Sequence, residues 1–206
     1  MQKKGTFVSF EGGEGTGKST QFALLGEYLT LIGRKVISIR EPGGTPVSEA
    51  LREFIMDNRE MVALTELLLY MASRAELFIK VVQPGLYSHD FVLADRGSDS
   101  TLAYQGYARG IPLETVNSAI QIATSGLVPD VTYLLDISPE IGLKRSSQVE
   151  TNRFEEEKIS FHQKVREGFL AIAKDNPSRI SIISAEKPKE EIFQEILFDL
   201  ITRKLV

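Results

Sequence analysis

The chain contains no cysteine among its 206 residues, and it has only two histidines. Without cysteine there are no disulfides, no thiolate zinc sites and no cysteine nucleophiles, although the redox compartment stays undetermined. Two histidines also argue against a histidine-rich metal site. Thiol chemistry is therefore excluded, and a zinc centre of the usual kind is disfavoured.

Long hydrophobic runs are missing as well. Even Leu64 to Ala72 is interrupted by Thr65 and Glu66, and it is far shorter than the ~18 residues of a membrane span. The basic start, Met1 to Gly5, precedes only a strand-length apolar run, too short for the apolar region of a signal sequence. We therefore expect a cytoplasmic protein with no membrane partner.

Positive charge is in deficit, because 28 acidic residues outnumber 24 basic ones and give a net charge of −4. A dedicated nucleic-acid binder needs a basic surface for its phosphate contacts. We expect no nucleic-acid partner, and any cationic site must be local.

The strongest motif is the stretch Glu11 to Thr20, EGGEGTGKST, which follows a short apolar run and precedes a helical pattern. Gly12, Gly17, Lys18 and Ser19 match GxxxxGKS, the phosphate-binding loop in which backbone N–H groups wrap a polyphosphate at a helix N-terminus. Lys18 supplies a charge for the β- and γ-phosphates, and the Ser19 hydroxyl can ligate Mg²⁺. A glycine-rich turn with a helix cap is the alternative, but the flanking strand and helix favour a nucleoside triphosphate site. The expected triphosphate contacts are Gly12, Gly13, Glu14, Gly15, Thr16, Gly17, Lys18, Ser19 and Thr20.

Five short β-rich runs alternate with longer helical patterns: Thr6 to Glu11, Val36 to Arg40, Phe91 to Asp95, Val131 to Asp136 and Arg179 to Ser184. Near-continuous apolar strands separated by helices are typical of a mostly parallel sheet covered on both faces. No internal repeat or low-complexity linker divides the chain, so we expect one domain over residues 1–206. The predicted fold is three-layer α/β/α with a five-stranded sheet, and ligands should bind at the carboxyl ends of its strands.

Charged residues end four of the five runs, namely Glu11, Arg40, Asp95 and Asp136. They cannot all belong to the core. Asp95 is expected to hold Mg²⁺ opposite the Ser19 hydroxyl, and we assign Glu11 to the same metal site. Arg96 follows directly and suits a phosphate, although a salt bridge with Asp95 is the alternative.

A Pro-Gly-Gly turn follows the second run, within Arg40 to Thr45. Such a turn lets backbone approach a ligand closely, while Thr45 or Ser48 can cap the helix that carries Arg52. Most turns of this kind are only turns, so the motif is weak by itself.

The third helix, expected over about Val62 to Val82, carries an arginine in its apolar stripe. Arg74 falls among leucines and Tyr70, and it could snorkel from the edge of the core or pair with a buried acid. Alternatively, Tyr70 and Arg74 lie one turn apart and can offer an aromatic face and a planar donor to a single base. The polar face of this helix comprises Glu66, Ser73, Glu76 and Lys80.

A charge-rich segment over about residues 144–157 joins two later helices. A charge run is usually a solvated face, but arginines placed after the fourth strand can also close over a triphosphate as a lid. The stretch Ser184 to Pro188 lies where an adenine could rest. We expect the helices over about Glu157 to Lys174 and Lys189 to Leu205 to carry no chemistry of their own.

Taken together, these motifs resemble those of the thymidylate kinase family along almost the whole chain. The matching segments, in order and spacing, are Phe10 to Thr20, Arg40 to Thr45, Asp95-Arg96 with Asp99 to Gly106, and Pro129-Asp130 before Leu135-Asp136. The resemblance implies the P-loop nucleoside monophosphate kinase fold and ATP-dependent phosphorylation of dTMP to dTDP. It also implies ATP and Mg²⁺ as cofactors and a homodimeric cytoplasmic enzyme.

The resemblance further implies roles on the acceptor side. The arginine matching Arg74 contacts thymine O4, and Tyr70, usually phenylalanine in the family, stacks on the base. Positions matching Arg52 and Arg96 grip the dTMP phosphate, and Tyr104 lies under the 2′ carbon. The other expected substrate contacts are Glu41, Pro42, Thr101 and Gln105.

The bacterial type of the family carries its catalytic arginine in the lid and none in the phosphate loop. Glu14-Gly15 in this loop indicates that type, so Arg153 inherits the catalytic role, with Arg145 and Lys144 as alternatives. Arg145 is also expected on the ATP side. The remaining catalytic residues are Lys18, Arg96 and Glu14, of which Glu14 is assigned to orienting the acceptor side.

Two other functions stay open. A kinase for another nucleotide or a deoxynucleoside would use the same fold and loop, because specificity resides in few contacts. A nucleotide-dependent switch protein is disfavoured, since the chain has no NKxD guanine-reading motif and Asp95 to Ser98 is not a DxxG switch.

Overall fold

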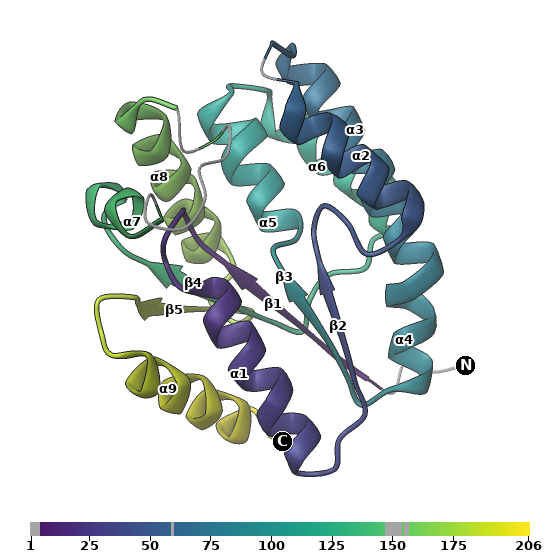
Figure 1. Ribbon diagram of the computed structural model, residues 1–206, viewed down its shortest axis with the longest axis vertical. Coiled ribbons are helices and arrows are strands. Elements are labelled where there is room, and N and C mark those ends of the chain that lie inside the picture. Colours follow the sequence, from purple (N-terminus) through teal and green to yellow (C-terminus); the bar gives the residue numbers. More distant parts are fainter. Residues whose placement is uncertain (1–4, 59, 147–153, 155–156) are drawn as a thin grey trace.

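The computed structural model describes residues 5–58, 60–146, 154 and 157–206. Within these residues, one parallel sheet has the strand order β2-β3-β1-β4-β5 (Figure 1). Its strands are β1 (Thr6–Glu11), β2 (Val36–Arg40), β3 (Phe91–Asp95), β4 (Val131–Asp136) and β5 (Ile180–Ser184). The predicted strands and the three-layer fold are confirmed, with β5 starting one residue later than expected.

Helices cover both faces of this sheet, with α1 and α9 side by side on one of them (Figure 1). The π-helical turns η1 and η2 continue the helices that precede them. The elements are α1 (Lys18–Leu31), α2 (Pro46–Asp57), α3 (Ala63–Leu77), η1 (Phe78–Val82), α4 (Gln83–Ser88), α5 (Ser98–Thr101), η2 (Leu102–Ala108), α6 (Leu113–Thr124), α7 (Pro139–Ser146), α8 (Ile159–Asp175) and α9 (Lys189–Thr202).

The strands are apolar because both of their faces are buried. Side chains alternate across a strand, so Val8 and Leu93 face α1 and α9, whereas Phe7 and Val92 pack against η1 and α4. All four side chains are at most 1% exposed. Full burial of each contributes about 1.5–3 kcal/mol, which holds the strand ends in register at one edge of the sheet.

The third helix extends further than the sequence predicts. Instead of ending near Val82, it continues from α3 through η1 into α4 and ends at Ser88. Pro84 is the second residue after the π-helical turn η1, and the helix continues past it to Ser88.

The polar face expected on this helix is only partly a solvent face. Glu66 and Ser73 are each 1% exposed, because α2 and α6 pack along α3. The Ser48 hydroxyl donates to the Ser73 carbonyl at 2.8 Å, which ties α2 to α3. Glu76 and Lys80 pair with each other nearer the surface. Periodicity alone identified the polar residues but not the helices that cover them.

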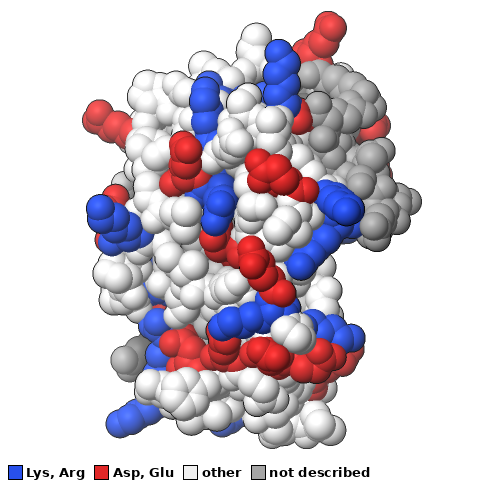
Figure 2. All heavy atoms as spheres, turned by 90° about the vertical axis from the view of Figure 1, so that its left-hand side faces the viewer, with Lys and Arg blue, Asp and Glu red and all other residues white. Residues whose placement is uncertain are grey.

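Charges of both signs are interspersed on the side of the molecule that carries α7, α8 and α9 (Figure 2). Among the residues described there, no continuous positive track is presented to a nucleic-acid backbone. Within the described ranges, none of the helices is both long and apolar enough to cross a bilayer.

Candidate active site

The carboxyl ends of the strands open into a cleft of about 740 Å³. Its walls come from the phosphate loop, the ends of β2 and β3, and helices α2, α3, α5, η2 and α7. The predicted site residues that line it are Glu14, Gly15, Gly17, Lys18, Ser19, Thr20, Glu41, Pro42, Arg52, Tyr70, Arg74, Asp95, Arg96, Thr101, Tyr104, Gln105 and Arg145. Residues from segments far apart in the sequence are thus brought to one cavity.

The phosphate loop has the backbone conformation that its glycines were expected to permit. Gly12, Gly15 and Gly17 have φ angles of 142°, 64° and 85°, a region that side chains disfavour. Helix α1 begins directly after the loop at Lys18, so its N-terminal N–H groups face the cleft edge. Gly12 and Gly13 lie on the other side of the loop and line a small cavity against α8.

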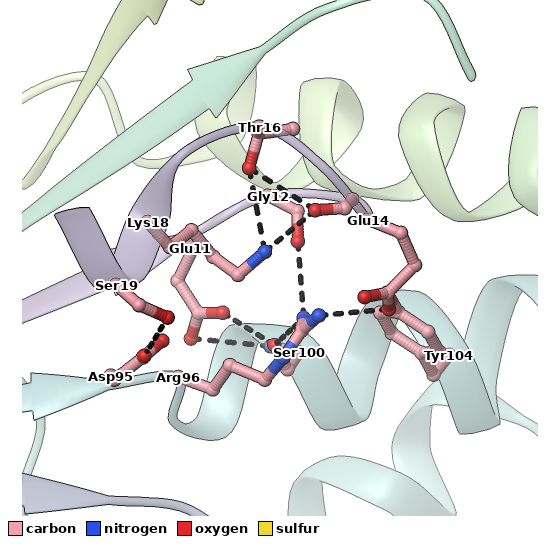
Figure 3. Close-up of polar contacts among 11 residues, drawn as sticks. Glu11, Gly12, Glu14, Thr16, Lys18, Ser19, Asp95, Arg96, Ser100 and Tyr104 are labelled. Atoms are coloured by element: carbon pink, nitrogen blue, oxygen red, sulfur yellow. Dashed lines mark hydrogen bonds and ion pairs between the residues drawn. The ribbon is translucent and has the colours of Figure 1, made fainter. Parts of the chain in front are cut away.

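Lys18 is folded back on its own loop. Its Nζ donates to the Gly13 carbonyl at 2.6 Å and to the Thr16 hydroxyl at 3.4 Å (Figure 3). Burial, together with the nearby charge of Arg96, lowers the Lys18 pKa to about 8. The ammonium group therefore stays mostly charged at neutral pH, and a phosphate oxygen can replace the carbonyl.

Glu14 and Arg96 form an ion pair across the cleft. Arg96 donates to the Glu14 carboxylate at 2.8 Å and to the Gly12 carbonyl at 3.0 Å, and its guanidinium lies over the Tyr104 ring (Figure 3). The Tyr104 hydroxyl donates to the same carboxylate at 2.7 Å. Burial opposes ionisation, yet the charges of Arg96 and Lys18 outweigh it and lower the Glu14 pKa to about 2. The negative charge of Glu14 is thereby compensated by the two cations before any polyanion binds.

A hydroxyl and a carboxylate lie in contact at the end of β3. The Ser19 hydroxyl donates to the Asp95 carboxylate at 2.6 Å. Glu11 lies at the end of β1, where its carboxylate accepts from the Ser100 hydroxyl and N–H, at 2.5 and 3.3 Å. Burial and the Asp99 charge raise the Glu11 pKa to about 7. Within the described ranges, no group of three or more His, Cys, Asp and Glu residues could hold a metal.

The structure bears out one of the interpretations that the sequence position of Arg74 allowed, the pairing with a buried acid, while its contact with a base stays a prediction. Arg74 is 2% exposed and pairs with a buried acid, because its Nε donates to Glu41 at 2.5 Å, while its NH2 donates to the Gly97 carbonyl at 2.9 Å. It also lines the cleft with Tyr70, one turn earlier. Burial raises the Glu41 pKa, although Arg74 acts in the opposite direction.

Helix α2 places Arg52 in the lining of the same cleft as Tyr70 and Arg74. The Thr45 hydroxyl caps the helix by accepting from the Ser48 N–H at 3.1 Å, so Thr45 is the capping residue of the two candidates. Arg52 donates to the Pro42 carbonyl at 2.9 Å, which leaves its charge at the cleft wall.

Comparison with known proteins identifies the family. The thymidylate kinase family model matches residues 10–196. The chain belongs to the thymidylate kinase family. A thymidylate kinase of Thermoanaerobacter sp. (strain X514) is 41% identical over 203 residues, which cover 98% of this chain and 100% of that protein. Another, of Synechococcus sp. (strain JA-3-3Ab), is 48% identical over 179 residues, 87% of each chain.

A solved structure agrees with this assignment to the thymidylate kinase family. The crystal structure of thymidylate kinase from Ehrlichia chaffeensis superposes with a TM-score of 0.80 at 33% identity, covering 95% of this chain and 98% of that one. The resemblance inferred from the motifs is confirmed.

The cleft of this thymidylate kinase family member contains residues that the motifs did not identify. Phe154 lines it and packs edge-on against the Tyr104 ring, with centroids 5.5 Å apart. A lone aromatic residue in a charged segment was the signal available for this contact. The other cleft residues that were missed are Met56 and Ser146, whereas Arg40, Gly97 and Ser100 lie in stretches that the sequence had singled out without a residue-level role.

Helix α8 was expected to carry no chemistry of its own, and the structure places its polar side chains next to the phosphate loop. Arg166 forms a two-point ion pair with Asp136 at the end of β4, both contacts at 2.8 Å, and His162 is buried behind Glu14. These residues line the small cavity behind the phosphate loop. The helix therefore supports the loop, which its own periodicity did not reveal.

The lid expected in this family lies partly outside the described residues. Arg153 is not among them, and neither are residues 147–152, 155 and 156. Arg145 donates to the Ala185 carbonyl at 2.8 Å, so α7 is tied to the segment suggested for adenine.

Helix α7 also touches the phosphate loop directly. A Cβ on Gly15 would lie 1.9 Å from the Gly142 carbonyl oxygen, and one on Gly142 would lie 2.3 Å from the Glu14 carbonyl oxygen. Only two glycines allow the backbones to approach this closely.

Proposed function

We propose that this cleft carries out the ATP-dependent phosphorylation of dTMP to dTDP. One observation supports this most directly. The phosphate loop, with Lys18 and Ser19, shares a single cavity of about 740 Å³ with Tyr70, Arg74 and Gln105, which offer an aromatic ring, a planar donor and an amide. The cavity thus offers a triphosphate site and a base site, as transfer between two nucleotides requires.

The reaction needs charge neutralisation more than it needs a general base. A phosphate monoester has a second pKa of about 6, so the acceptor is already mostly a dianion at neutral pH. The barrier lies in bringing this dianion to the γ-phosphate. Lys18 and Arg96 supply positive charge, and both now donate to protein oxygens that phosphate oxygens can replace.

We further propose that Mg²⁺ accompanies ATP. The Ser19 hydroxyl and Asp95 carboxylate are oxygen ligands of the kind that Mg²⁺ prefers, and their 2.6 Å contact places them at the loop edge. When bound, the ion neutralises charge on the β- and γ-phosphates. We assign Glu11 to this site only as a more distant carboxylate, because Ser100 holds it.

The lid assignment rests on the sequence. We propose Arg153 as the catalytic arginine and residues 144–157 as the lid of a single domain spanning residues 1–206. Arg145 is assigned to the ATP side, supported by its hydrogen bond to Ala185 within the proposed adenine segment.

We propose that Arg74 donates to thymine O4 and that Tyr70 stacks on the base. Arginine only donates, so it favours a carbonyl oxygen over the amino group of cytosine. Arg52 and Arg96 are assigned to the dTMP phosphate, and Thr101, Tyr104 and Gln105 to the nucleoside. Discrimination against uracil rests on one methyl, worth only about 0.8 kcal/mol.

A cytoplasmic homodimer is the proposed state, and an exposed apolar stripe supports the dimer. Leu64, Leu68 and Ile79 follow one face of α3 and η1 and are each more than half exposed. Sedimentation of the native chain and of Leu68→Glu tests this. A native chain that sediments as a monomer at micromolar concentration contradicts it.

The activity is tested by mixing the purified protein with ATP, Mg²⁺ and each of dTMP, dUMP, dCMP, dGMP and dAMP. ADP and the phosphorylated acceptor are followed together. We expect dTDP to form fastest from dTMP. ADP release without a phosphorylated acceptor, or preference for another monophosphate, would contradict the acceptor assignment while leaving the phosphate loop intact.

A further inference from the structure

Glu66 is a buried carboxylate behind the base end of the cleft. It is 1% exposed and lies in the first turn of α3. It accepts from the Gln105 side-chain Nε2 at 2.8 Å and lies 3.4 Å from the Arg109 Nε. A buried acid is costly unless it is paired, so the partners of Glu66 explain how it is tolerated there.

Both contacts named above bring a hydrogen-bond donor to the Glu66 carboxylate. Arg109 supplies the positive charge, and it is itself held by an ion pair with Glu157 at 2.7 Å and by the Phe161 ring 4.6 Å below its guanidinium. The N-terminal end of α3 adds the positive end of a helix dipole. Arg109 and the Gln105 Nε2 both donate to the same Glu66 oxygen, and arginine cannot accept, so this oxygen serves as an acceptor.

This restricts the amide of Gln105, which is 2% exposed and belongs to η2. A glutamine amide has a donor end and an acceptor end, and turning it by 180° exchanges them. Beside Glu66, only the NH₂ end can face the carboxylate. The carbonyl oxygen is then the end left for the cleft that Gln105 lines.

We propose that Glu66 is a positioning residue that fixes Gln105 as an acceptor toward the base. This deepens the proposed function and rests on it. An acceptor selects a base whose ring nitrogen carries a hydrogen, as N3 of thymine does. Cytosine presents a lone pair at the same position and would meet the Gln105 oxygen acceptor to acceptor.

The substitution Glu66→Gln tests the proposal because it keeps the side-chain shape and removes the restriction. An amide at position 66 can donate or accept, so Gln105 can turn either end to the base. We expect the ratio of kcat/KM for dTMP over dCMP to fall about tenfold or more, since a site built for one hydrogen-bond pattern rejects the other strongly. The change should come through the KM for dTMP, with kcat at saturation unchanged.

Glu76→Gln is the matched control, because it makes the same change on the same helix at a residue that pairs with Lys80 and does not line the cleft. It should leave the ratio as in the native chain. The exchanged pair, Glu66→Gln with Gln105→Glu, again presents an acceptor to the base. It should raise the ratio back toward the native value.

A ratio within twofold of the native one in Glu66→Gln, with an unchanged unfolding midpoint, would overturn the proposal. An equal loss of kcat with both nucleotides would also overturn it, since that marks a purely structural role.

The amide orientation is tested separately, in the ligand-free protein, by NMR. In the native chain the Gln105 side-chain amide protons should exchange slowly with solvent, and in Glu66→Gln they should exchange faster. Fast exchange in the native chain would overturn the proposal even if dTDP forms normally. Slow exchange in a native chain that forms no dTDP would uphold the amide orientation while contradicting the proposed function and the base selection that depends on it.

Discussion

The two ends of the cleft are organised in opposite ways. At the base end, the functional side chains are held by buried acids, Glu41 behind Arg74 and Glu66 behind Gln105. At the phosphate end, Lys18 donates to a backbone carbonyl and Arg96 donates to Glu14. A phosphate can displace both of these acceptors.

At the base end the side chains are thus fixed before the substrate binds, whereas at the phosphate end the cations change partners when it binds. A side chain fixed before binding loses less conformational freedom when the base arrives, so the base end favours selectivity. The phosphate end keeps its cations satisfied until a polyanion replaces their partners. The base end should therefore respond to mutation through stability and affinity, and the phosphate end through rate.

The largest expected effect comes from breaking the support of the base end. Glu41→Ala leaves the Arg74 guanidinium buried without its carboxylate, which should lower the free energy of unfolding by about 3–5 kcal/mol. Urea unfolding measures the loss. Glu195→Ala, which breaks the exposed Lys187–Glu195 pair, is the control and should cost at most about 1 kcal/mol. Equal losses of unfolding free energy would mean that the buried Arg74–Glu41 pair contributes no more to stability than an exposed one.

At the phosphate end, Lys18→Met should reduce kcat by about 10²–10³ fold, the range for losing one charge-stabilising donor. The affinity for dTMP should change little, because Lys18 lies on the triphosphate side. Steady-state rates and dTMP titration measure the two quantities. If dTMP affinity fell in proportion to kcat, the two ends would not be independent.

Glu11, at the end of β1 and held by Ser100, gives a pH-dependent test. Its pKa is about 7 in the folded chain against an ordinary value of 4.5, so between these values the folded state binds more protons than the unfolded state. The free energy of unfolding should therefore fall as pH rises through this window. In Glu11→Gln this contribution is absent, and the difference from the native chain should change by up to about 3 kcal/mol between pH 4.5 and 7. A difference that stays constant with pH would contradict the raised pKa.

The smallest expected effect concerns stacking. Tyr70→Ala should weaken dTMP binding by about 1–3 kcal/mol, taking aromatic stacking on a base as the scale. Tyr70→Phe keeps the ring and should bind dTMP nearly as the native chain does. Calorimetric titration compares the three proteins, and unchanged affinity in Tyr70→Ala would rule out stacking at this position.

The sequence predicted those parts of the molecule that depend on local patterns. The strands follow from short apolar runs, and the phosphate loop from glycine, lysine and serine at fixed spacing. The same local reading recognised Arg74 as anomalous in an apolar stripe. It could not choose among the explanations, because the partner Glu41 lies 33 positions away in the chain.

What escaped prediction depends on packing between distant elements. Glu66 was read as a polar-face residue because helical periodicity does not report that α6 and η2 cover it. Phe154 and the residues of α8 were missed for the same reason, since their importance arises only where they meet Tyr104 and the phosphate loop. Burial by a neighbouring element leaves no periodic signal in the covered segment.

The backbone contact between Gly15 and Gly142 has a consequence for how mutations combine. A side chain at either position separates the phosphate loop from α7, because each Cβ would overlap a carbonyl oxygen of the other segment. Once the first substitution has opened that gap, the second meets little resistance. The two positions should therefore show positive epistasis, the double variant being scarcely worse than the Gly15 variant alone, which also carries the strain of a side chain at a φ of 64°.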